Sequence, residues 1–122
     1  MKGILLFAAF SGALGVGLGA FAAHGLKAVL SPAMVAVFQT GVHYQLIHTL
    51  ALLAVAILMR FLPATTLLYA AIFFIVGIVA FSGSLYLLAL TGIKWFGPIT
   101  PFGGICFIVG WIALFIAVWR HA

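Results

Sequence analysis

The sequence predicts an all-α integral membrane protein in which four antiparallel transmembrane helices form a compact bundle. Of the 122 residues, 68% are hydrophobic and 4% are charged, and none of the charged residues is Asp or Glu. Soluble domains carry about 25% charged residues, and five cations cannot cover the surface of a soluble fold. A spanning helix needs about 20 mostly apolar residues. The chain therefore has room for four spans in a single transmembrane domain covering residues 1–122.

The first half of the chain contains two of the expected spans. The first covers about residues 4–23 and ends before His24. The second covers about residues 35–60. It follows Ser31 and Pro32, a capping residue with a proline at the first helical position, which is a typical helix start.

The second half contains the other two spans. The third is expected over about residues 64–90, directly after Pro63, so that its short connection to the second span requires an antiparallel hairpin. The fourth is expected over about residues 101–120. Thr100 and Pro101 repeat the combination of a capping residue and a proline at its start.

The distribution of cations predicts how the protein is oriented. Positively charged residues are enriched on the cytoplasmic side of membrane proteins. The side that holds the termini has three cations and the opposite side has two, which favours both termini in the cytoplasm. The first group is Lys2, Arg60 and Arg120, and the second is Lys27 and Lys94.

Missing residue types exclude several functions. Paired carboxylates, Ser-His-Asp triads and oxygen-ligand sites for magnesium or calcium all need acidic side chains. A zinc site built from His24, His43 and His48 would require a convergence that helix geometry makes awkward. Cys106 lies in an apolar run and is expected to be packed rather than reactive. No catalytic residue, metal or cofactor is therefore predicted, and the scattered cations give no reason to expect nucleic acid as a partner.

Small residues are expected at helix contacts. In membranes, small residues let helix backbones approach each other closely. Packing within the monomer is the favoured interpretation, and a seam with a second copy or another protein is the alternative. The expected packing residues are Ser11, Gly15 and Gly19 in the first span and Gly103, Gly104 and Gly110 in the fourth.

Polar residues gather in the half of the predicted bundle that lies away from the termini. Polar groups in hydrocarbon normally face the bundle interior or a cavity, so this clustering predicts a polar-lined pocket for a ligand. The alternative is that each group only ties two helices together by a hydrogen bond. The candidate residues are His24, Gln39, Tyr44, His48, Ser82, Ser84 and Tyr86.

His48 is the most informative of these residues, because it lies near the middle of its span. A neutral imidazole is expected there, and Tyr44, one helical turn earlier, is expected to hydrogen-bond it directly. A histidine with only a structural role is the first interpretation. Ligation of haem by a single histidine and a quinone-type site are the alternatives.

Four motifs resemble a known family. They are GAFAAHGLK at 19–27, FQTGVHYQLIH at 38–48, FSGSLY at 81–86 and ITPFGG at 99–104, followed by Gly110 and Trp111. In this order they resemble the small four-helix membrane family called domain of unknown function 423, over nearly the whole chain. Ala22 stands where the family usually has glycine. The resemblance implies a bacterial inner-membrane protein and supplies no activity.

Two classes of function follow from these observations. The first is an accessory or structural membrane protein that binds lipid or a larger membrane complex. Its expected partners are membrane lipids and either a second copy of the chain, in a homo-oligomer, or a larger membrane complex. The second is a carrier or binding protein for a small solute or lipophilic ligand, which would use the polar half-pocket. Any proton coupling in such a carrier would have to depend on histidine, because the chain has no carboxylate side chain.

Overall fold

The structure confirms the predicted all-α class. This computed structural model describes residues 1–63 and 65–122, and within these residues every regular element is helical. The predicted start of the third span at Ala64 lies outside the described residues. Four segments are long and apolar enough to cross a membrane, namely Lys2–Ala28, Pro32–Leu58, Thr65–Thr91 and Lys94–His121.

The helices follow one another with short connections, and the third span is subdivided. A π-helical turn, η2, separates α3 from α4, and short 3₁₀ turns precede α2 and α5. The elements are α1 (Lys2–Ala23), η1 (Leu26–Ala28), α2 (Pro32–Leu58), α3 (Thr65–Gly77), η2 (Ile78–Ser82), α4 (Gly83–Thr91), η3 (Lys94–Phe96) and α5 (Ile99–His121).

Two helix starts show where sequence signals succeed and fail. The predicted start of α2 is confirmed, because the Ser31 side chain accepts a hydrogen bond from the Met34 N–H at 3.3 Å and Pro32 is the first helical residue. The predicted cap at Thr100 is wrong. Helix α5 already begins at Ile99, and the Thr100 hydroxyl instead bonds the Ser84 hydroxyl at 2.6 Å. An early start is tolerated because N–H groups of the first turn have no acceptor within the helix, so Pro101 removes no helical bond.

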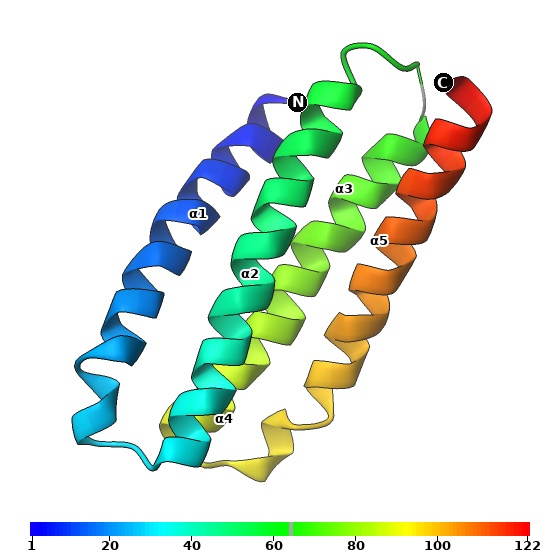
Figure 1. Cartoon of the computed structure of the whole chain (residues 1–122). Coiled ribbons are helices and arrows are strands. Elements are labelled where there is room, and N and C mark those ends of the chain that lie inside the picture. The colour runs from blue at the N-terminus through cyan, green and yellow to red at the C-terminus, as the bar shows by residue number, and fades with distance from the viewer. Residues whose placement is uncertain (64) are drawn as a thin grey trace.

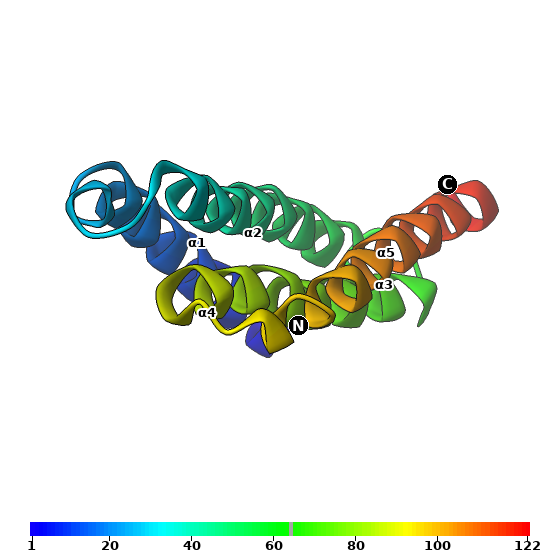
Figure 2. The same cartoon turned by 90° about the horizontal axis from the view of Figure 1, so that it is seen from below.

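The helices are arranged with α2 and the third span at the centre. Helix α1 packs mainly on α2, and α5 packs mainly on α3 and η2, while α2 contacts α3, η2 and α4. Figure 1 shows both termini and the connection between α2 and α3 at one end of the bundle. Seen from below, in Figure 2, α1 and α5 lie at opposite sides of the molecule.

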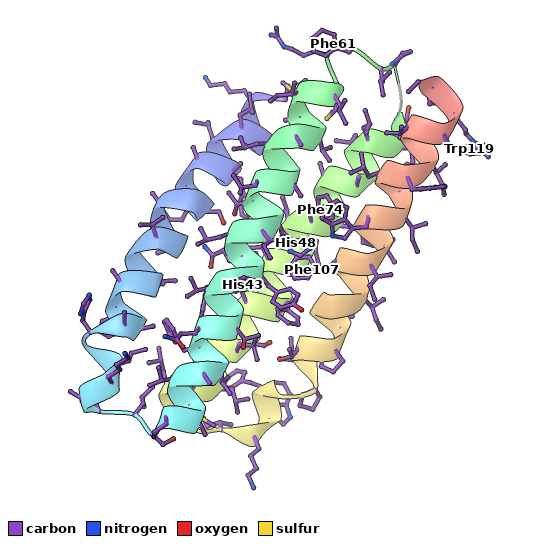
Figure 3. All side chains as sticks on the ribbon, viewed as in Figure 1. His43, His48, Phe61, Phe74, Phe107 and Trp119 are labelled. Atoms are coloured by element: carbon purple, nitrogen blue, oxygen red, sulfur yellow. The ribbon has the colours of Figure 1, made fainter. Side chains whose placement is uncertain are left out.

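Two apolar clusters hold these helices together. One includes Leu52, Leu67, Phe74 and Phe107 and joins α2, α3 and α5. The other joins α1, η1, α2 and α4 around Phe38. Large apolar side chains also cover the outer surface, as expected for helices that face lipid. Phe61 and Trp119 are exposed at the end that holds the termini (Figure 3), where aromatic residues are typical of a membrane interface.

Candidate functional site

A buried hydrogen-bond network connects three helices in the interior of the bundle. The Gln45 amide of α2 donates to the Ser11 carbonyl oxygen of α1 at 2.9 Å and accepts from the Tyr86 hydroxyl of α4 at 2.5 Å. The Ser11 and Thr49 hydroxyls are 2.8 Å apart. These four residues, Ser11, Gln45, Thr49 and Tyr86, form what we call the interior network. Its side chains bond each other, as polar groups in hydrocarbon require.

Two serines make further ties between helices. The Ser82 hydroxyl of η2 donates to the Gly41 carbonyl oxygen of α2 at 2.6 Å. The Ser84 hydroxyl lies 2.9 Å from the Phe81 carbonyl oxygen and 2.6 Å from the Thr100 hydroxyl of α5. Both serines are buried. Their geometry matches the alternative interpretation, in which polar residues tie helices together.

His48 is held in a single arrangement between α2, α3 and α5 (Figure 3). The Trp111 indole N–H donates to His48 Nε2 at 3.0 Å, and His48 Nδ1 lies 2.8 Å from the Tyr44 carbonyl oxygen. Because an indole can only donate, Nε2 accepts and Nδ1 carries the proton. The imidazole is therefore neutral, and neither ring nitrogen is free to ligate a metal in this arrangement.

This arrangement corrects the predicted contact between Tyr44 and His48. The Tyr44 side chain does not hydrogen-bond His48. Its backbone carbonyl does, because residues four apart lie one above the other on a helix. The imidazole instead stacks on the Phe107 ring, with centroids 3.6 Å apart and an angle of 11° between the planes.

The stacked rings of His48 and Phe107 form part of the wall of an open groove between α2 and α5. Its volume is about 440 Å³, and Tyr44 and Trp111 are exposed at its edges. None of the hydrogen bonds made by the described residues involves the Tyr44 hydroxyl. We call this feature the aromatic groove. It is lined by Tyr44, His48, Phe81, Pro101, Gly104, Phe107, Ile108 and Trp111.

The structure does not bring the seven predicted ligand residues into one pocket. Only Tyr44 and His48 line the aromatic groove. Tyr86 belongs to the interior network, while Ser82 and Ser84 tie helices. The sequence showed that the residues share a depth, but the direction of each side chain around its helix separates them.

Two of the seven are exposed and lie away from these contacts. Gln39 faces outward on α2 and lines a hollow of about 430 Å³ together with Lys27 and Pro32. His24 is exposed at the end of α1. Within the described residues, no group of three histidine or cysteine side chains is placed to hold a metal ion.

The small residues lie where helices come close together. A Cβ atom on Gly15 would lie 2.6 Å from Leu46, one on Gly19 would lie 3.3 Å from Val42, and one on Gly110 would lie 2.6 Å from Phe74. A Cβ on Gly103 would overlap the Phe81 backbone, so α5 and η2 are in direct contact there.

Gly104 and Ser11, the other two predicted packing residues, do not lie at such tight contacts between glycine and a neighbouring helix. A Cβ on Gly104 would meet the Phe81 ring only at an ordinary 3.8 Å, and this residue lines the aromatic groove. Ser11 uses its hydroxyl in the interior network.

Three residues that organise these contacts were not among the predicted site residues, namely Gln45, Thr49 and Trp111. Gln45 and Thr49 are four residues apart and so share a helix face, a signal that the sequence contained. Trp111 carried no such signal, because its contact with His48 joins residues 63 positions apart in the chain.

Comparison with known proteins shows what the chain is similar to. A family described as "Protein of unknown function (DUF423)" matches residues 18–104. A UPF0382 membrane protein of Staphylococcus aureus is 42% identical, with 100% of this chain and 99% of the relative covered. No solved structure matches the chain.

Two further relatives are similar over most of their length. The UPF0382 membrane protein YwdK of Bacillus subtilis is 41% identical, over 99% of each chain. The UPF0382 inner membrane protein YgdD of Escherichia coli K12 is 39% identical, over 96% of this chain and 89% of the relative. With its four apolar helices, the chain is a multi-pass membrane protein, and it belongs to the DUF423 family.

Proposed function

We propose that the protein is a non-enzymatic accessory membrane protein that binds a lipophilic molecule in the aromatic groove. The proposal depends on one observation. The Tyr44 hydroxyl has no hydrogen-bond partner among the described residues, although Tyr44 lies one residue from Gln45, the centre of α2. A polar group at that depth is costly unless it is hydrogen-bonded. A molecule that supplies an acceptor would satisfy it.

The lining of the groove favours a flat ring as the bound group. The Tyr44 ring packs on Phe81 with centroids 4.7 Å apart, and the His48 ring lies flat on Phe107. The volume of about 440 Å³ falls in the range of small-molecule sites, roughly 300–1,000 Å³. Phospholipid tails offer no acceptor at mid-membrane depth. A lipid-soluble ring that carries a carbonyl group, such as a quinone, has both the required shape and the acceptor.

His48 has a positioning role in this proposal. Both of its ring nitrogens are hydrogen-bonded to the protein, so the ring supplies a fixed surface rather than a base or a metal ligand. Binding is favoured over the alternative of a solute carrier, because the polar side chains of the interior network already bond one another. A transport path through them would have to break these bonds.

Fluorescence of Trp111 provides the test. The chain has three tryptophans, and in a Trp95→Phe/Trp119→Phe background Trp111 at the groove is the only reporter. Menadione, a lipid-soluble quinone, should quench this fluorescence saturably in lipid nanodiscs. Tyr44→Phe should raise its Kd about fivefold, because one hydrogen bond contributes about 1 kcal/mol.

Tyr69→Phe is the matched control. Tyr69 is exposed on α3 and does not line the groove, so this variant should keep the parent Kd. Quenching that does not saturate, or an equal effect of the two substitutions, would refute a specific site at Tyr44.

The location of the protein is part of the same proposal. We place it in a bacterial inner membrane with both termini in the cytoplasm. The similarity to YgdD, which is named an inner membrane protein, supports the choice of membrane. The excess of cations at the end that holds the termini, from Lys2, Arg60 and Arg120, supports the orientation. A reporter enzyme that is active only outside the cytoplasm, fused after Ala122, should give no activity. Strong activity would reverse the orientation.

A further inference from the structure

The outward face of α2 has polar side chains in the middle of the membrane. Six exposed residues recur along it at intervals of three or four, which places them on one side of the helix. We call this surface the α2 outer face, and it consists of Ala36, Gln39, His43, Ile47, Leu50 and Ala54. In Figure 3, His43 lies on the side of α2 turned away from α4.

His43 lies close to the middle of the membrane-spanning helix. Helix α2 has 27 residues centred on Gln45. A rise of 1.5 Å per residue puts His43 about 3 Å and Gln39 about 9 Å from the centre. The hydrocarbon core extends about 15 Å to each side. His43 is therefore too far from the headgroups for an imidazole to reach them.

The polar side chains of this face have no hydrogen-bond partner among the described residues. None of the hydrogen bonds made by the described residues involves the side chain of His43 or Gln39. His43 only touches the Tyr44 ring edge to face, with centroids 6.1 Å apart. Histidines in membrane spans almost always face a bundle interior or a cavity. In the single chain this one faces lipid, which offers neither a donor nor an acceptor.

We propose that the α2 outer face binds a second copy of this chain, with the two α2 helices parallel about a two-fold axis along the membrane normal. Such an axis brings each residue of the face to the same residue of the second copy at the same depth. A neutral imidazole and a carboxamide each carry both a donor and an acceptor. His43 can therefore hydrogen-bond the same residue of the second copy, with one imidazole as donor and the other as acceptor. Gln39 can pair with its counterpart in the same way through the two side-chain amides.

The remaining residues of the face suit such a contact. Ala36 and Ala54 are small and lie near its two ends, where they let the helices approach. Ile47 and Leu50 supply apolar packing between them. Tyr44 lies about 100° further round the helix than His43. The aromatic groove therefore stays accessible in the dimer, and the dimer does not depend on the proposed ligand.

Cysteine cross-linking of the full chain in bacterial membranes tests the proposal. Ile47→Cys on the α2 outer face should give a disulfide-linked dimer on mild oxidation. Ile112→Cys is the matched control, since Ile112 is an exposed isoleucine that lies, like Ile47, two residues beyond the centre of its helix. The parent chain should not cross-link, because its single cysteine, Cys106, is buried. Equal cross-linking of the two variants, or an adduct with a mass other than twice the chain, would overturn the proposal.

A second set of variants tests whether the polar side chains hold the dimer. His43→Leu in the Ile47→Cys background should lower the dimer equilibrium constant about threefold, and His43→Leu/Gln39→Leu about eightfold, from the average strength of interhelical hydrogen bonds in membranes. Ile112→Leu, on the exposed surface of α5 and therefore outside the face, should leave it unchanged. An unchanged constant in the double variant would show that polar pairing does not hold the copies together.

Discussion

The two sides of α2 hold polar residues at nearly the same depth but in opposite environments. On the inward side, Gln45 is buried and bonds residues of both α1 and α4. On the outward side, His43 is exposed and bonds no described residue. The two residues are only two positions apart. The comparison shows that the role of a polar residue in a membrane helix is set by its direction around the helix, because direction decides whether a partner is within reach.

His48 lies between these extremes. Its ring is buried and fully hydrogen-bonded, as on the inward side. It also forms part of the floor of a groove that opens outward. The aromatic groove is thus a place where the paired interior meets the lipid-facing surface, which is why Tyr44 at its edge has an unpaired hydroxyl.

The largest expected effect on the free energy of unfolding comes from placing a large side chain at Gly15, where α1 and α2 are in close contact. Gly15→Leu should reduce the free energy of unfolding by about 1–3 kcal/mol, because overpacking a close contact is destabilising, and the new side chain would meet Leu46. Thermal unfolding in detergent, followed by circular dichroism, measures this.

Gly17→Leu is the control for that prediction. It adds the same side chain to the same helix, but a Cβ at Gly17 meets nothing within 4 Å. This variant should unfold like the parent. If the two variants unfold alike, α1 does not pack on α2 through Gly15.

A smaller effect is expected from removing the centre of the interior network. Gln45→Leu leaves the Tyr86 hydroxyl without its acceptor and removes the donor to the Ser11 carbonyl. With interhelical hydrogen bonds worth about 0.6 kcal/mol on average and up to about 1.7, we expect a loss of roughly 1–2 kcal/mol in the free energy of unfolding. Gln39→Leu, on the outward side, should leave the stability of the monomer unchanged in dilute detergent. Equal losses would contradict the distinction between the two sides.

The smallest expected effect compares two histidines on the same helix. His48→Phe keeps a ring of similar size on Phe107 but removes the acceptor for the Trp111 indole. We expect a loss of about 0.6 kcal/mol. His43→Phe makes the same chemical change on the outward side and should not change the unfolding of the monomer. A larger loss for His43→Phe would mean that His43 has a partner within the chain.

Much of the architecture follows from the sequence alone. The lack of acids and the four apolar runs predicted four membrane helices, because only helices satisfy every backbone group inside a single span. Ser31 and Pro32 predicted the start of α2, because capping depends on adjacent residues. The depth of each polar residue also followed from counting along the helices.

The tertiary structure decided which of these residues meet. The bond from Trp111 to His48, the contact of Gly103 with Phe81 and the π-helical turn η2 depend on how α5 lies against α2 and the third span. Polar residues at one depth were predicted to share a pocket, yet Gln39, His48 and Tyr86 point in three directions. Counting residues gives the depth of a side chain along its helix. Only the packing of neighbouring helices determines whether that side chain finds a partner, a groove or lipid.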